Sequence, residues 1–312
     1  MTAIRVLVVD DSAFTRKVLR EILERGGFEV VGVARDGLDA LEKLEQLKPD
    51  VVTLDLMMPN LDGLGVLRAV PSTNKARFVI VSVSSDDSAL VVEAFQLGAL
   101  DLVHKPTALA TQQLFELSGE LVTKVRIAAG ARTPPARRVV GEAVVAPGRS
   151  ARTRVTTKRL TVLGTSTGGA QALMYVLPGL PADLPVPVVV ALHIPSGYTA
   201  ALARRLNDLC AVSVVEAMND QRLQPGFVYI TPGGFHSTIV RDAEGLRVRL
   251  DGDPRPSPYT PSVDTLFTSA AAACGSSVVG VVLTGMGDDG LLGARALRAA
   301  GAEVVTEAES SC

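Results

Sequence analysis

The first 120 residues show two alternating hydrophobic spacings. Short apolar runs are typical of buried strands, and between them apolar residues recur at steps of three and four, as on one face of a helix. Phe14, Val18 and Ile22 follow the helical spacing. The strand-like runs are Ile4–Val9, Phe28–Ala34, Asp50–Leu54, Phe78–Ser82 and Leu100–Val103. This alternation predicts an α/β domain with a five-stranded parallel sheet.

A second series of alternating elements follows residue 160. The predicted strands are Leu160–Leu163, Pro185–Leu192, Val212–Ala217, Phe227–Ile230, Leu246–Leu250, Ser277–Leu283 and Ala302–Val305. The predicted helices are Ala170–Leu177, Thr199–Leu209, Val263–Ala273 and Leu291–Ala299. We therefore expect a second doubly wound, mainly parallel α/β domain with a small antiparallel insert near residues 235–250. The proline-rich stretch Pro254–Tyr259 predicts a stiff surface loop.

Charge divides the chain into the same parts. Residues 121–159 carry ten Lys or Arg and one Asp or Glu, among Pro and Gly, whereas the net charge of the whole chain is −2. We predict a first domain over 1–127, a basic linker over 128–159 and a second domain over 160–312. An Arg-rich arm that binds nucleic acid is an alternative interpretation of the linker. No aromatic residue or DNA-binding motif accompanies these arginines, so a charged tether is favoured.

Composition limits the class of protein. Hydrophobic residues make up 47% of the 312 residues and charged residues 21%, which fits a globular protein with a large core. No run of about 18 apolar residues suggests a membrane span, and the start of the chain is unlike a signal peptide. The cysteines are Cys210, Cys274 and Cys312, in no disulfide or zinc pattern. We expect a cytoplasmic protein without direct membrane insertion.

Charged and hydroxyl side chains follow the predicted strands of the first domain. Asp10 and Asp11 come after the first strand, Asp55 after the third, Ser82 ends the fourth and Lys105 follows the fifth. The carboxyl ends of parallel strands meet at one edge of a sheet, where ligands bind. Three converging carboxylates would repel one another unless a hard cation such as Mg²⁺ lay among them.

These residues, together with Asp55-Leu56-Met57-Met58-Pro59 and Lys105-Pro106, resemble the receiver domain of two-component response regulators. The resemblance implies that Asp55 is the phosphoacceptor, that Asp10, Asp11 and Asp55 hold Mg²⁺, and that Ser82 and Lys105 are switch residues. It also implies a flavodoxin-like fold for this domain and a histidine kinase as phosphodonor. Leu102 stands where many receivers place an aromatic switch residue, so we expect that signal transmission through this face differs.

A glycine-rich turn follows the first strand of the second domain. Gly164-Thr165-Ser166-Thr167-Gly168-Gly169 predicts a strand, a tight turn and a helix, with Ser166 at the apex. Such a turn can present a nucleophilic serine beside free helix N–H groups, or it can bind phosphate. A serine nucleophile needs a base and an orienting acid at neighbouring strand ends. His193 follows an apolar run and is the candidate base, and spacing leaves Asp288 and Asp289 open as the acid.

This turn resembles the catalytic domain of the chemotaxis protein-glutamate methylesterases, the CheB family. Further matching segments are His193-Ile194-Pro195, Pro232-Gly233, His236, Pro261-Ser262-Val263-Asp264 and Leu283-Thr284-Gly285-Met286-Gly287-Asp288-Asp289-Gly290. The resemblance implies Ser166 as nucleophile, His193 as base and Asp289 as orienting acid, with Thr167 and Met286 as oxyanion or substrate contacts. The chain departs from the family pattern at Thr165 and Leu192. Because the family continues through a further helix, the resemblance also implies that the C-terminal end is incomplete.

The resemblance implies a phosphorylation-activated hydrolase that demethylates glutamate methyl esters, and deamidates glutamines, on methyl-accepting chemoreceptors. It implies no cofactor in the esterase site and no nucleic acid as partner. The main alternative is a response regulator whose second domain is a non-catalytic module that binds a partner protein. An ester hydrolysis assay separates the two.

Overall fold

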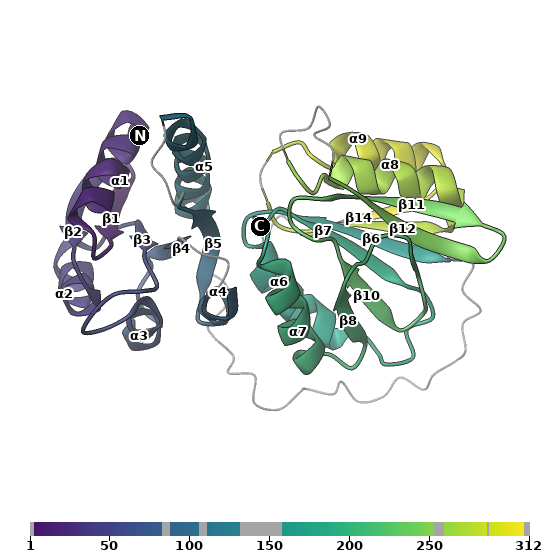
Figure 1. Cartoon of the computed structure of the whole chain (residues 1–312), viewed down its shortest axis with the longest axis horizontal. Coiled ribbons are helices and arrows are strands. Elements are labelled where there is room, and N and C mark those ends of the chain that lie inside the picture. The colour runs from purple at the N-terminus through teal and green to yellow at the C-terminus, as the bar shows by residue number, and fades with distance from the viewer. Residues whose placement is uncertain are drawn as a thin grey trace.

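The protein is described by a computed structural model that covers residues 3–82, 88–105, 111–131, 158–252, 259–285 and 287–308. Figure 1 shows two α/β domains side by side, the first in purple to blue and the second in teal to yellow. No helix in the described ranges is long and apolar enough to cross a bilayer. Most of the predicted linker lies outside the described residues, so its boundaries stay a prediction.

The first domain has a five-stranded parallel sheet in the order β2-β1-β3-β4-β5. This order is that of flavodoxin-like folds, which place ligands at the carboxyl ends of the strands. The strands are β1 (Arg5–Val9), β2 (Glu29–Ala34), β3 (Val51–Leu54), β4 (Arg77–Ser82) and β5 (Ala99–His104). The helices are α1 (Ala13–Arg25), α2 (Gly37–Leu47), α3 (Gly63–Ala69), α4 (Ser88–Gln96) and α5 (Thr111–Gly130). The five predicted strands are confirmed, and α5 continues past residue 127 to Gly130.

Side-chain caps define the starts of several of these helices. Ser12, Asp36 and Asp62 are the N-caps of α1, α2 and α3, and each side chain accepts a hydrogen bond from the N–H three residues on. Such caps satisfy donors that have no partner within the helix. The caps of α1 and α3 lie next to the acidic cluster, so they fix the loops that surround it.

The second domain has a six-stranded parallel sheet in the order β14-β13-β6-β7-β10-β8 and a three-stranded antiparallel sheet in the order β11-β12-β9. The parallel strands are β6 (Leu160–Thr165), β7 (Val188–Leu192), β8 (Ser213–Glu216), β10 (Phe227–Ile230), β13 (Val278–Val282) and β14 (Glu303–Thr306). The antiparallel strands are β9 (Gln221–Arg222), β11 (His236–Asp242) and β12 (Gly245–Asp251). The helices are α6 (Gly169–Val176), α7 (Thr199–Leu209), α8 (Val263–Cys274) and α9 (Leu291–Ala299), with short 3₁₀ turns at Leu177–Gly179 and Gly275–Ser277.

The predicted fold class is confirmed, with one local correction. The preceding residues Pro232-Gly233-Gly234-Phe235 predict that His236 lies in a loop beside the insert, but it is the first residue of β11 and is fully buried. The two-residue strand β9 was not predicted, because two residues cannot show a hydrophobic period.

The two domains are joined by an apolar interface. Figure 1 shows α4 and β5 of the first domain facing α6 and α7 of the second, and residues of these elements are in contact. Buried side chains of both domains, such as Phe95 and Leu102 from the first and Leu173 and Leu202 from the second, belong to one continuous hydrophobic cluster. The first domain therefore packs on the same side of the second sheet as α6, the helix that follows the Ser166 turn.

Candidate functional sites at the ends of two sheets

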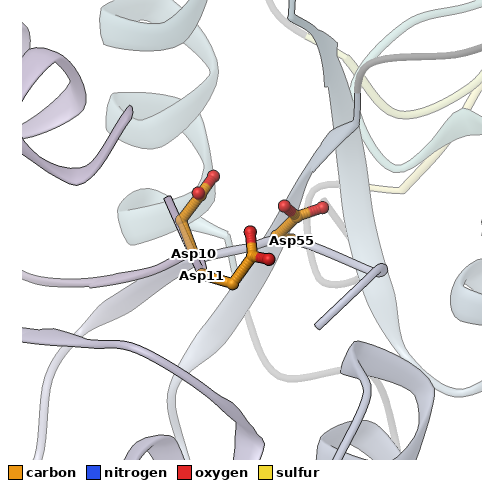
Figure 2. Close-up of side chains that lie close together, drawn as sticks. All are labelled: Asp10, Asp11 and Asp55. Carbon is orange, nitrogen blue, oxygen red and sulfur yellow. The ribbon is translucent and has the colours of Figure 1, made fainter. Parts of the chain in front are cut away.

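Three carboxylates converge at the carboxyl edge of the first sheet. Figure 2 shows Asp10, Asp11 and Asp55 with their carboxyl groups gathered around a common space. One oxygen from each lies within 4.8 Å of the others, and Asp10 and Asp55 are buried whereas Asp11 is exposed. Only oxygen donors converge, which suits a hard divalent cation. The acidic cluster is typical of a magnesium-binding phosphorylation site.

Lys105 places an ammonium group next to two of these carboxylates. Its Nζ donates to Asp10 Oδ2 at 2.6 Å and to Asp55 Oδ2 at 2.7 Å. Burial raises the pKa of the Asp55 carboxyl above its usual value, although the nearby Lys105 charge acts in the opposite direction. Ser82 is buried at the end of β4, and its carbonyl accepts a hydrogen bond from the Lys105 N–H at 2.6 Å. All five residues predicted for this site therefore lie at one sheet edge.

Ser166 lies in the turn between β6 and α6. Two backbone hydrogen bonds hold this turn. The Ser166 N–H donates to the Thr284 carbonyl at 3.0 Å, and the Gly169 N–H donates to the Ser166 carbonyl at 2.7 Å. Gly168 has φ of 77°, a left-handed conformation that favours glycine before the helix begins. A Cβ on Gly285 would lie 2.6 Å from the Ser166 Cβ, so only glycine fits opposite the serine.

His193 connects Ser166 to an acid. It follows β7, and its Nδ1 lies 3.0 Å from Ser166 Oγ while its Nε2 lies 2.8 Å from Asp289 Oδ2. A carboxylate can only accept, so Nε2 carries the proton toward Asp289. In the neutral ring Nδ1 is then an acceptor that faces the Ser166 hydroxyl. Ser166, His193 and Asp289, predicted from separate segments, therefore form one hydrogen-bonded chain.

Asp289 is held by the N-terminus of α8. Its carboxylate accepts from the Ser262 hydroxyl at 2.9 Å and from the N–H groups of Val263 at 2.7 Å and Asp264 at 2.9 Å. Burial raises the pKa of Asp289, but the hydrogen bonds from His193 and these N–H groups outweigh burial and lower the pKa below its usual value. Of the two acids that spacing left open, Asp289 contacts His193, whereas Asp288 is exposed.

A second carboxylate fixes the loop that carries Asp289. Asp264 Oδ1 accepts from the Gly290 N–H at 2.9 Å and the Gly293 N–H at 2.7 Å, at the start of α9. The sequence did not predict the roles of Ser262 and Asp264. A hydroxyl residue at a helix N-cap is the only local signal, and it predicts capping rather than contact with a residue far along the chain.

Thr167 and His236 lie near this chain of hydrogen bonds. Thr167 is buried, and its carbonyl accepts from the Thr284 hydroxyl at 3.2 Å. Met286 lies outside the described residues. His236 Nδ1 accepts from the Ser262 N–H at 3.2 Å, so this histidine supports the segment before α8. A cavity of about 80 Å³ next to Ser166 is lined by Gly164, Val263, Val282, Leu283 and Thr284, among others.

The first domain contacts the Ser166 turn directly. The Leu100 carbonyl on β5 accepts from the Gly168 N–H at 3.2 Å, and Gln171 Nε2 on α6 donates to the Ala99 carbonyl at 2.8 Å. His104 Nδ1, next to Lys105 in the chain, lies 3.3 Å from the hydroxyl of the buried Tyr198. Strand β5 thus has Lys105 of the acidic cluster at its end and the contacts to α6 and α7 along its length.

Comparisons with known proteins agree with this two-part structure. A family described as CheB methylesterase matches residues 161–312, and one described as response regulator receiver domain matches residues 6–116. The protein-glutamate methylesterase/protein-glutamine glutaminase 5 of Myxococcus xanthus is 57% identical over 100% of this chain and 90% of its own length. An enzyme of the same name from Symbiobacterium thermophilum is 45% identical over 99% of this chain and 88% of its own length.

A solved structure, the Thermotoga maritima CheB methylesterase catalytic domain, is 37% identical with a TM-score of 0.48, covering 50% of this chain and 82% of that chain. The two family matches and the identity over nearly the full length of the relatives lead to one conclusion. The chain belongs to the CheB family of protein-glutamate methylesterases/protein-glutamine glutaminases that carry a receiver domain.

Proposed function

We propose that this protein hydrolyses γ-glutamyl methyl esters, and deamidates glutamines, on methyl-accepting chemoreceptors by a Ser-His-Asp mechanism. The observation that carries the proposal is the continuous chain from Ser166 Oγ through His193 to Asp289, with links of 3.0 and 2.8 Å. The names of the relatives, which are methylesterases and glutaminases, support the substrate class.

Catalysis begins at the Ser166 hydroxyl. His193 Nδ1 takes its proton as Ser166 Oγ attacks the ester carbonyl, and Asp289 holds the ring and stabilises the imidazolium that forms. The N–H of Thr167, the residue after the nucleophile, and the backbone at Met286 would stabilise the oxyanion. His193 then gives this proton to the leaving methoxide, which departs as methanol, or to the leaving amide nitrogen of a glutamine, which departs as ammonia. Water attacks the acyl-enzyme with His193 as base, which leaves glutamate and free Ser166.

Replacing the nucleophile tests this mechanism. Ser166→Ala should abolish methanol release from methylated receptor membranes, while circular dichroism and thermal unfolding stay those of the wild type. The half-buried side chain loses only its oxygen, so the fold should tolerate the change. Full turnover by a clean preparation of this variant would remove Ser166 from the mechanism.

For the first domain, we propose that a histidine kinase supplies phosphate to Asp55. Asp10, Asp11 and Asp55 would hold Mg²⁺, which when bound offsets the charge of the carboxylates and of the phosphoryl group. Lys105 would release Asp55 and pair with the phosphoryl group, and the Ser82 hydroxyl would donate to it. The gathering of oxygen donors around one space supports this assignment.

We further propose that phosphorylation activates the esterase by loosening the docked receiver. The support is the contact of β5 with the Ser166 turn, through Leu100 and Gly168, on the strand that leads into Lys105. A small phosphodonor with Mg²⁺ should raise methanol release by the wild type but not by Asp55→Asn. Equal rates with and without the phosphodonor would contradict this gating.

A further inference from the structure

A tyrosine outside the predicted triad covers one face of His193. The rings of Tyr259 and His193 are stacked, with centroids 4.4 Å apart and planes that differ by 1°. Tyr259 lies just before α8, the helix whose N-terminus holds Asp289. The two rings therefore come from segments far apart in sequence, and the tyrosine lies in the segment that leads into α8.

The groups around the imidazole are placed on its edge and on its face. Ser166 Oγ and Asp289 Oδ2 lie 3.0 and 2.8 Å from the two ring nitrogens, whose lone pair and N–H point in the plane of the ring, and Tyr259 covers a face. A Cβ on Gly287 would lie 3.0 Å from the Tyr259 hydroxyl oxygen, so the far end of the tyrosine lies against the loop that carries Asp289. The tyrosine thus contacts both the imidazole and the loop of its acid.

We propose that Tyr259 is a positioning residue for His193, a role that rests on the proposed Ser-His-Asp mechanism and extends it. A flat ring packed against the imidazole restricts rotation of the ring out of the plane that Ser166 and Asp289 share. Because the reacting groups must be aligned within a narrow range, this restriction favours proton transfer between Ser166 and His193.

The stack also suits the reaction step in which positive charge develops on the imidazole. Neutral aromatic rings prefer offset or edge-to-face arrangements, whereas a cation is attracted to the electron-rich face of a tyrosine. His193 becomes a cation when it takes the Ser166 proton. A contact that strengthens only at that step lowers the barrier without tightening substrate binding. The contact is therefore expected to act on kcat and not on KM.

One short segment accordingly supports His193 from two directions. Tyr259 covers the face of the imidazole, while Ser262, Val263 and Asp264 donate to the carboxylate at its edge. A merely space-filling tyrosine would affect stability or substrate access, and it would not distinguish an aromatic from an aliphatic replacement of similar size.

The experiment compares Tyr259→Phe, Tyr259→Leu and Tyr259→Met in the full-length protein, with methanol release from methylated receptor membranes as the assay. Tyr259→Leu and Tyr259→Met should each lower kcat about tenfold with KM within about twofold, and Tyr259→Phe should stay within about twofold of the wild type in both. Tyr175→Leu is the matched control, because Tyr175 is 83% exposed on α6, and it should change nothing.

A spectroscopic readout accompanies the kinetics. The proton on His193 Nε2, hydrogen-bonded to Asp289, should give a downfield ¹H resonance that is missing in His193→Gln. We expect it to persist in Tyr259→Phe and to broaden or disappear in the aliphatic variants, since a ring that rotates exchanges this proton with water.

The outcomes separate this inference from the mechanism on which it rests. Wild-type kcat in both aliphatic variants, a loss in Tyr259→Phe as large as in Tyr259→Leu, or a change confined to KM would overturn the positioning role. In each of these cases an inactive Ser166→Ala would leave the Ser-His-Asp mechanism standing. Full activity of Ser166→Ala would instead reject the mechanism itself, whatever the Tyr259 variants do.

Discussion

The two sheets each end in a buried carboxylate, and the two carboxylates are compensated in opposite ways. Asp289 accepts from His193, from the Ser262 hydroxyl and from two backbone N–H groups. Asp55 instead shares the single Lys105 ammonium with Asp10. Both oxygens of the Asp289 carboxylate therefore have hydrogen-bond donors. The site around Asp55 instead carries more negative than positive charge.

The pKa values follow this difference. Burial acts on both groups in the same direction, but only at Asp289 do the donors outweigh it, so its pKa lies below the usual value whereas that of Asp55 lies above it. A carboxylate whose charge is stabilised by hydrogen bonds within its own domain suits a fixed catalytic role. A buried carboxylate with uncompensated charge near it suits a site that receives a cation and then a phosphoryl group.

Among the variants that test this comparison, the largest effect is expected from replacing the Asp289 carboxylate. Asp289→Asn should lower kcat for methanol release by roughly 10⁴-fold, the loss known for the same change in another serine hydrolase. The amide N–H of the new asparagine would donate to His193 Nε2, so the ring proton would lie on Nδ1, the nitrogen that faces Ser166. His193 could then no longer accept the Ser166 proton. Asp288→Asn is the control on a neighbouring exposed acid and should leave kcat unchanged. If the two variants lost activity equally, the assignment of Asp289 would be wrong.

A steric change at the turn should have the next largest effect. In Gly285→Ala the new methyl group would lie 2.6 Å from the Ser166 Cβ, so the serine must move. A displacement of about 1 Å at a reacting atom costs about 10²-fold in rate. Gly179→Ala is a suitable control, because nothing lies within 4 Å of a Cβ placed there. Wild-type turnover in Gly285→Ala would show that the Ser166 turn shifts without cost.

The opposite pKa directions predict opposite pH dependences of stability. A carboxyl whose pKa is lowered by folding adds stability that is present above its unfolded value, about 4, and lost as pH falls through the folded value. Asp289→Asn should therefore cost about 1–3 kcal/mol of unfolding free energy at pH 7, and this cost should shrink toward pH 3. A raised pKa has the reverse sign, so the charged Asp55 destabilises the fold as pH rises through its folded value.

The matched variant at the other site is Asp55→Asn, compared by urea unfolding over the same pH range in a chelating buffer. It should gain stability relative to the wild type as pH rises, and Mg²⁺ should cancel this gain by stabilising the wild type alone. The same pH trend in both variants would mean that the two carboxylates do not differ in the way their pKa directions indicate.

The sequence predicted the helices and strands better than it predicted the hydrogen bonds and packing contacts that position the site residues. Apolar periodicity placed α7 and α9 at their observed bounds, and strand ends located His193 and the acidic cluster. Spacing alone could not choose between Asp288 and Asp289, and only the family resemblance favoured Asp289, since the choice depends on N–H groups of α8 that any residue type provides. The stack of Tyr259 on His193 was also beyond reach, because it depends on how the segment before α8 packs against the end of β7.

The smallest expected effect concerns the contact between the two regions. Gln171 on α6 donates to the Ala99 carbonyl at 2.8 Å and, more weakly, to that of Phe95 at 3.4 Å, so it joins the esterase to the receiver. Losing these neutral hydrogen bonds should weaken docking by about 0.5–1.5 kcal/mol, so Gln171→Ala should raise methanol release without phosphodonor about two- to tenfold. The rate with phosphodonor should stay unchanged, because the docked form no longer limits it. Gln46→Ala, which removes an exposed contact to Glu42 on α2, is the control and should leave both rates alone. A basal rate equal to that of the wild type would mean that the Gln171 contact does not hold the esterase in check.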